Sequence, residues 1–158
     1  MPNFCQNLAN FSHPDPKMIE AVLESNNESC LFQRFVPCPE ELLEGGWYEW
    51  CIENWGTKWD QCNTDEAEID DPNSIELSFD TAWSPPVEFY RKMKELGFTV
   101  EAYFYEPGCQ FCGSFKDGTE VFVDIEGDSE WARENIPTEI DEVFDIVCNL
   151  EYLEAEEE

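Results

Sequence analysis

The alternation of apolar and polar residues predicts a sheet of several strands. An apolar residue at every second position over 74–80 predicts one strand, and 98–105 shows the same period. Segments 110–115 and 119–125 flank an Asp-Gly pair, which favours a two-stranded hairpin. The first segment, 3–11, alternates less regularly and is interpreted as a further strand.

Helical spacing of apolar residues predicts three helices, two between these strands and one after them. The first begins after a proline-containing turn at 12–16 and ends at Asn26 and Asn27. The second begins at Ser84, which can cap a helix that starts with proline, and ends at Gly97. The third begins at Pro137 and directs an acidic face toward solvent.

Two remaining segments complete the predicted order of elements. Residues 31–36 are interpreted as a second strand, and 39–73 as an irregular Trp-rich insertion that its tryptophans tie to the main core. The resulting fold is α+β, a ferredoxin-like split βαβ sandwich in which this unit is repeated once, with this insertion and with a C-terminal hairpin plus helix. We expect a single domain over 1–150, followed by a frayed acidic tail at 151–158.

Composition changes this picture mainly through charge. The chain has 158 residues, with 37 Asp and Glu against 8 Lys and Arg, and its net charge is -29. Because aromatic residues make up 15%, the acidity belongs to a folded surface and not to an unfolded tail. Such a charge excludes direct binding of nucleic acid and disfavours anionic membranes, since both require Lys and Arg.

The sequence shows no targeting segment and no membrane span. No stretch approaches the roughly 18 consecutive apolar residues of a spanning helix, and the opening residues do not resemble a signal peptide. We therefore expect the cytoplasm of a bacterial host, where the eight cysteines stay reduced.

Catalytic and metal-binding motifs are weak. Cys109 and Cys112 form a single C-x-x-C pair within a predicted strand, two ligands short of a structural zinc site. His13, the single histidine, precedes a proline in a turn and is interpreted as a surface or cap residue. We therefore predict no catalytic residue, no metal and no cofactor, with Cys109 and Cys112 as weak metal candidates.

Five short segments resemble one known family. They are 1–7 (MPNFCQN), 36–42 (VPCPEEL), 53–59 (ENWGTKW), 79–86 (FDTAWSPP) and 105–108 (YEPG). In this order they resemble the YubB-like family, ferredoxin-like proteins of unknown function carried by plasmids and phages. The resemblance implies the fold and a mobile-element origin, and it brings no catalytic residues.

The first functional hypothesis is mimicry of DNA. Residues 101–158 hold 18 acids against Lys116 and Arg133, and duplex DNA presents about one negative charge per 1.7 Å of axis. We expect the protein to inhibit a host nucleic-acid-binding defence system, such as CRISPR-Cas or restriction, by occupying its basic surface. The predicted contact residues are Glu126, Asp128, Glu130, Glu134, Glu139, Asp141, Glu142 and Asp145. The alternative interpretation is that the acidity only keeps the protein soluble.

The second hypothesis is a small-ligand module or enzyme at the Trp-rich edge. Its predicted pocket residues are Asn54, Trp55, Lys58, Trp59, Asp80 and Trp83. Lys58 is expected to pair with Asp60 or Asp80, because it is the only cation between Arg34 and Arg91. The structural alternative is that these residues lock the insertion onto the sheet.

Overall fold

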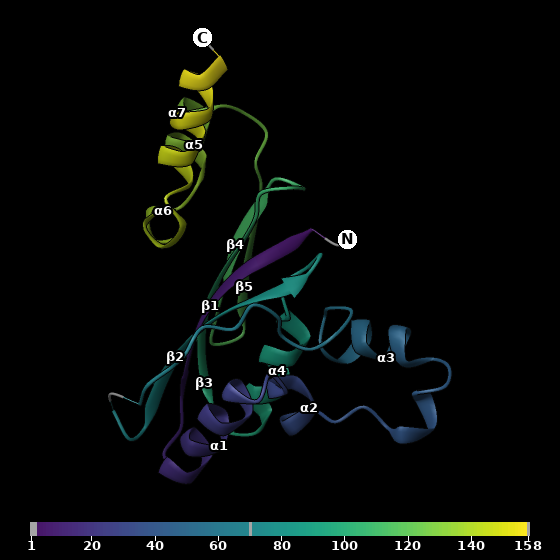
Figure 1. Ribbon diagram of the computed structural model, residues 1–158. Helices are drawn as coiled ribbons and strands as arrows, with labels where there is room; N and C mark the ends of the chain where they lie inside the picture. The colour runs from purple at the N-terminus through teal and green to yellow at the C-terminus, as the bar shows by residue number, and fades with distance from the viewer. Residues whose placement is uncertain (1–2, 70, 158) are drawn as a thin grey trace.

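The computed structural model describes residues 3–69 and 71–157 (Figure 1). The strands are β1 (Phe4–Ser12), β2 (Ser74–Ala82), β3 (Thr99–Glu106), β4 (Phe111–Lys116) and β5 (Thr119–Asp124). The helices are α1 (Pro16–Asn27), α2 (Leu31–Phe35), the 3-10 helix η1 (Glu40–Leu42), α3 (Trp47–Asn54), α4 (Val87–Glu95), α5 (Ser129–Asn135), α6 (Thr138–Phe144) and α7 (Ile146–Glu157).

The strands form one antiparallel sheet in the order β2-β1-β3-β4-β5. Strands β2 and β3 run parallel on either side of β1, and α4 connects them, so this part is a split βαβ unit. The chain then continues from β3 through β4 to β5 as a meander. The predicted α+β class is confirmed, and the strands predicted from alternation are present.

The two faces of the sheet are covered differently. Cys5, Ala9 and Phe11 of β1 alternate inward and pack with Val100 and Phe104 of β3 in the main core, which α1, α2 and α4 complete. On the opposite face, the C-terminal helices α5, α6 and α7 lie over one end of the sheet (Figure 1). Their smaller core includes Tyr105, Cys112, Ile140 and Ile146.

The predicted strand at 31–36 is wrong, because residues 31–35 form the helix α2. The Asp60 carboxylate accepts hydrogen bonds from the backbone N–H groups of Phe32 and Gln33, at 3.0 Å each. Gln61 Oε1 accepts another from Leu31 N at 2.9 Å. These caps come from far along the chain, and they satisfy the first N–H groups of the helix. The split βαβ unit therefore occurs once and is not repeated.

The insertion and the C-terminus are more helical than expected. The segment 39–73 contains η1 and α3, and the single C-terminal helix of the prediction is divided into α6 and α7. Asp145 lies between them with a positive φ of 53°, and α5 was not predicted at all. Since α7 runs to Glu157, the expectation of a frayed tail is wrong for residues 151–157.

Candidate functional site

Part of the second face of the sheet carries no helix, and we call this part the open face. Except for Leu8, its side chains are the polar members of the alternation along β1, β2 and β3, which point away from the main core. The open face comprises Gln6, Leu8, Asn10, Glu76, Ser78, Asp80, Glu101 and Tyr103.

Three adjoining hollows follow the open face, and we call them together the groove. The first, of 440 Å³, lies between the sheet and the α6 residues Val143 and Phe144. The second, of 170 Å³, shares Leu8 with the first and shares Asn10 and Glu76 with the third, of 330 Å³. The groove therefore runs along β1 and β2.

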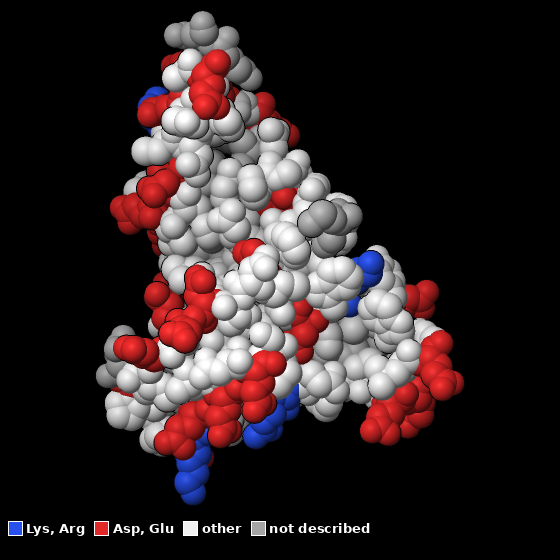
Figure 2. Space-filling model, in the orientation of Figure 1, with Lys and Arg blue, Asp and Glu red and all other residues white. Residues whose placement is uncertain are grey.

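The groove is acidic along its whole length. Its carboxylates are Asp65, Glu66, Glu68, Asp71, Glu76, Asp80 and Glu101. Among the described residues that line it there is no Lys or Arg. Figure 2 shows Asp and Glu side chains spread over the visible surface, with Lys and Arg confined to a few places. The groove thus offers negative charge without an internal counter-charge.

Asp80 is the carboxylate most affected by this environment. The backbone of Asp80 pairs with that of Cys62 through two hydrogen bonds of 2.8 Å, which hold the preceding loop against β2. Burial raises the pKa of the Asp80 carboxyl and nearby Asp65 raises it further, whereas the hydrogen bond from Asn63 Nδ2, at 2.9 Å, opposes the increase. The ionised form of Asp80 is therefore disfavoured in the folded protein.

We expect Asp80→Asn to raise the melting temperature at neutral pH. A raised folded-state pKa makes the carboxyl stabilising below its unfolded pKa, and this contribution is lost as pH rises through the folded value. The advantage of asparagine should therefore shrink as pH falls from 7 toward the acid range. Thermal unfolding of both proteins across this range measures it, with the exposed Glu130→Gln as a charge-matched control. An equal shift in the two variants at every pH would contradict the assignment.

Lys116, which pairs with Glu101 of the open face across β3 and β4, is already engaged. Lys116 Nζ lies 5.4 Å from the centroid of the Tyr103 ring and forms an ion pair with Glu139 of α6. Tyr103 Oη donates to Glu101 Oε1 at 2.8 Å. These contacts join the sheet to the C-terminal helices and leave the groove carboxylates uncompensated.

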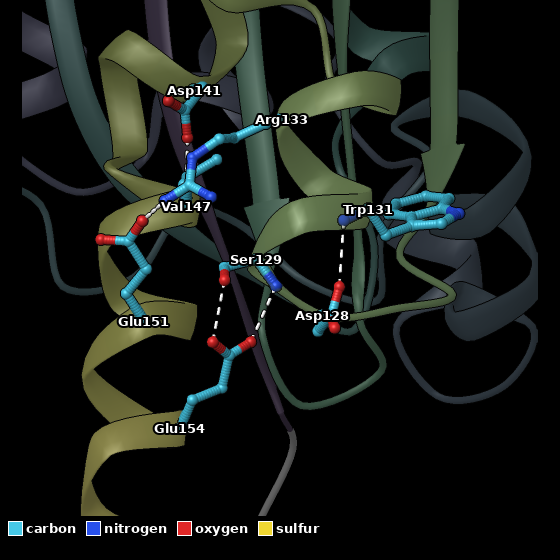
Figure 3. A network of polar contacts seen from close by, with 8 residues as sticks. All are labelled: Asp128, Ser129, Trp131, Arg133, Asp141, Val147, Glu151 and Glu154. Atoms are coloured by element: carbon cyan, nitrogen blue, oxygen red, sulfur yellow. Dashed lines mark hydrogen bonds and ion pairs between the residues drawn. The ribbon is translucent and has the colours of Figure 1, made fainter.

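The eight acids predicted as a contact surface fall into two groups. Asp128 accepts a hydrogen bond from Trp131 N at 3.0 Å and caps α5, while Asp141 accepts one from Val147 N at 2.8 Å (Figure 3). These two carboxylates, together with the Lys116-bound Glu139, stabilise the fold. The other five are exposed and form no ion pair within the described part of the chain. We call them the acidic helix surface: Glu126, Glu130, Glu134, Glu142 and Asp145.

Two further acids, both on α7, connect the C-terminal helices, and neither was among the eight predicted contact residues. Glu154 of α7 accepts hydrogen bonds from the backbone N and the hydroxyl of Ser129, both at 2.8 Å, and Glu151 pairs with Arg133 (Figure 3). These contacts fasten α7 to α5. The acidic helix surface is therefore displayed on a braced unit.

Within the Trp-rich edge, Trp55 belongs to the core and not to a pocket. It is 4% exposed, and its ring centroid lies 5.7 Å from that of Phe32 and 5.5 Å from that of Trp50. Its indole N–H donates to Val36 O at 2.8 Å. Asn54 Nδ2 donates to Trp50 O at 2.9 Å, so both residues stabilise the insertion.

The other proposed pocket residues are dispersed. Lys58 Nζ lies 4.7 Å from the Trp59 ring centroid, and the ion pairs of the described chain do not include the expected one with Asp60 or Asp80. Trp83 is 46% exposed. Of the six, Asp80 alone among the described residues lines the groove.

The two cysteines of the C-x-x-C pair lie in different environments. Cys109 is exposed in the turn after β3, where Asn3 Nδ2 lies 3.6 Å from its sulfur. Cys112 is buried beneath the C-terminal helices, and burial raises the pKa of its thiol to about 11. Within residues 3–69 and 71–157, no group of three His, Cys, Asp or Glu side chains is placed to hold a metal ion.

Comparison with known proteins agrees with the fold. A family model of the ferredoxin-like domain in Api92-like protein matches residues 54–148, which confirms the predicted ferredoxin-like class. The uncharacterized protein YubB of Escherichia coli K12 is 29% identical over 104 residues, 64% of this chain and 70% of YubB. A crystal structure of the protein api92 from Yersinia pseudotuberculosis is 19% identical, with a TM-score of 0.44 over 62% of this chain and 40% of that protein.

The chain thus spans less than half of the api92 structure that it matches. In the described residues, no helix combines the length and apolar character that crossing a membrane requires.

Proposed function

The chain belongs to the family of the ferredoxin-like domain in Api92-like protein, and from this premise we propose that it is a non-enzymatic binding protein that mimics DNA. Its partner would be the basic surface of a host nucleic-acid-binding defence complex, and its source a phage or plasmid. The relatives' names supply no activity, so the proposal depends on the surface of this chain.

The acidic helix surface is the observation that supports the proposal. Five exposed carboxylates of one braced unit are not engaged in ion pairs within the described residues. A basic groove that binds phosphates recognises such unpaired negative charges by the same long-range attraction. Complementary charge of this kind gives fast, salt-sensitive association.

The groove extends this negative surface toward the sheet. Val143 and Phe144 line its first hollow and belong to α6, which also carries Glu142. A partner bound to α6 could therefore place Lys or Arg side chains against Asp80 and Asp65. This arrangement favours protein binding over catalysis, because it presents many similar carboxylates.

Neutralising the acidic helix surface is expected to abolish partner capture. The variant combines Glu126→Gln, Glu130→Gln, Glu134→Gln, Glu142→Gln and Asp145→Asn. Tagged wild-type protein should retain nucleic-acid-binding proteins from a bacterial lysate at low salt, and either high salt or excess duplex DNA should release them. Retained proteins are identified by mass spectrometry, and their amounts in the two captures are compared.

A second variant with the same change in net charge serves as the control. It neutralises five exposed acids of η1, α3 and the turn between them: Glu40, Glu41, Glu44, Glu49 and Glu53, each to Gln. These elements lie far from α5 and α6 (Figure 1). If the control variant loses the partner as fully as the first variant, or if duplex DNA does not compete, DNA mimicry is wrong.

A further inference from the structure

The two edges of the sheet differ in their protection. The β2 edge is covered by the preceding loop, through backbone hydrogen bonds from Cys62 N to Asp80 O and from Asp65 N to Ser78 O. At the β5 edge, the backbone hydrogen bonds within the described residues connect this strand to β4 alone. An uncovered edge strand is a template for another extended segment.

The register shows which backbone groups β5 offers. Asp117 and Gly118 both have positive φ, 46° and 94°, and they form a two-residue turn that places Lys116 opposite Thr119. In such a hairpin the flanking pair is hydrogen-bonded, and the pairs then alternate along the strands.

The backbone N–H and C=O groups of Thr119, Val121 and Val123 therefore hydrogen-bond to β4. The hydrogen bond from Ile125 N to Gln110 O follows the same alternation. The N–H and C=O groups of Glu120, Phe122 and Asp124 point outward.

The side chains along this edge combine an apolar centre with acidic ends. Phe122 is 51% exposed, and its ring stacks on that of Phe111 with a centroid distance of 5.1 Å. Glu120 and Asp124 lie two residues away on either side, so all three side chains share one face. Glu120 Oε2 also accepts a hydrogen bond from Arg91 Nη2 at 3.0 Å, within an ion pair.

A second copy of the chain does not suit this edge. Antiparallel pairing of two β5 strands about Phe122 would place Glu120 of one copy opposite Asp124 of the other, and like charges in this position are destabilising. Each copy also carries a net charge of -29. The complementary occupant has positive charge where β5 is negative.

We infer that the β5 edge binds an extended segment of a partner protein as an added strand. The segment carries an apolar residue opposite Phe122, with Lys or Arg two positions before and after it. Main-chain hydrogen bonds to Glu120, Phe122 and Asp124 provide affinity, and the alternating side chains provide specificity. Of the acidic helix surface, Glu126 follows Asp124 by two residues, whereas the other four acids lie on or beside α5 and α6, outside this edge.

The probe is a fluorescent synthetic peptide, Thr-Arg-Thr-Leu-Thr-Arg-Thr, titrated with the full chain by anisotropy. Phe122→Pro removes an outward N–H and the exposed ring but no bond to β4, and it should raise the Kd roughly tenfold or more. Amide exchange should show new protection at Glu120, Phe122 and Asp124 when the peptide is bound.

A charge exchange keeps the test decisive if the proline variant unfolds. The double variant Glu120→Lys and Asp124→Lys should lose the arginine peptide and bind the same peptide with Glu in place of Arg. A variant that neutralises Glu130, Glu134, Glu142 and Asp145 but keeps Glu126, which lies two residues from Asp124, should bind the arginine peptide as the wild type does. That result separates this site from the proposed function.

Several results would overturn the inference. They are an absence of peptide binding by the wild type, equal binding by a folded Phe122→Pro variant, and peptide-induced protection along β1 and β2 without protection of β5. Sedimentation that reveals a dimer whose β5 amides are protected without peptide would assign the edge to a second copy instead.

Discussion

Trp55→Ala is expected to lower the free energy of unfolding by about 4 kcal/mol. The substitution removes a nearly fully buried indole that packs between Phe32 and Trp50. It also leaves Val36 O without the N–H that the indole donates to it. Urea unfolding followed by circular dichroism measures the loss, because this signal does not depend on Trp fluorescence.

Trp83→Ala is the matched control for this prediction. Trp83 belongs to the same group of sequence motifs but is 46% exposed, so its removal should cost clearly less stability than the removal of Trp55. If Trp55→Ala were as mild as Trp83→Ala, Trp55 would not anchor the insertion, and the hypothesis of a ligand pocket at the Trp-rich edge would regain support.

Strands were predictable here because their pattern is local. Ile75, Leu77 and Phe79 of β2 alternate with polar residues, and one buried face requires such alternation. Residues 31–35 could not be assigned in this way, since the side chain of Asp60 caps α2 from the far side of the insertion. A contact of this kind leaves no trace in the period of the segment itself.

The candidate site was predictable only in part for a similar reason. The sequence motif around Asp80 indicated a site residue. Its neighbours in the groove, however, come from β1 through the pairing of Gln6 with Asp80 and of Leu8 with Ser78. That register brings together residues more than 60 positions apart. Exposure of Glu142 on α6 followed from helical spacing, whereas the helix α5 and the capping roles of Asp128 and Asp141 required the turns that the structure shows.

Gly113→Ala is expected to destabilise the protein by about 3 kcal/mol or more. A methyl group on Gly113 would lie 2.0 Å from Val121 O and 2.4 Å from Phe104 Cζ. The register places Gly113 between Phe104 on β3 and Phe122 on β5, and these two rings meet with centroids 6.2 Å apart. The methyl group can therefore be accommodated only if β5 or the Phe104 ring moves.

The control for this prediction is Gly45→Ala, because nothing lies within 4 Å of a methyl group at that position. It should be neutral or stabilise the protein by up to about 0.5 kcal/mol, through a smaller entropy of the unfolded chain. Urea unfolding of both variants, with amide exchange along β4 and β5, measures the difference. Loss of protection at Val121 and Val123 should accompany Gly113→Ala, since the methyl group displaces the strand that carries the open edge. A Gly113→Ala protein as stable as Gly45→Ala would mean that β4 and β5 do not pair in this register, and the outward groups of Glu120, Phe122 and Asp124 would then have to be reassigned.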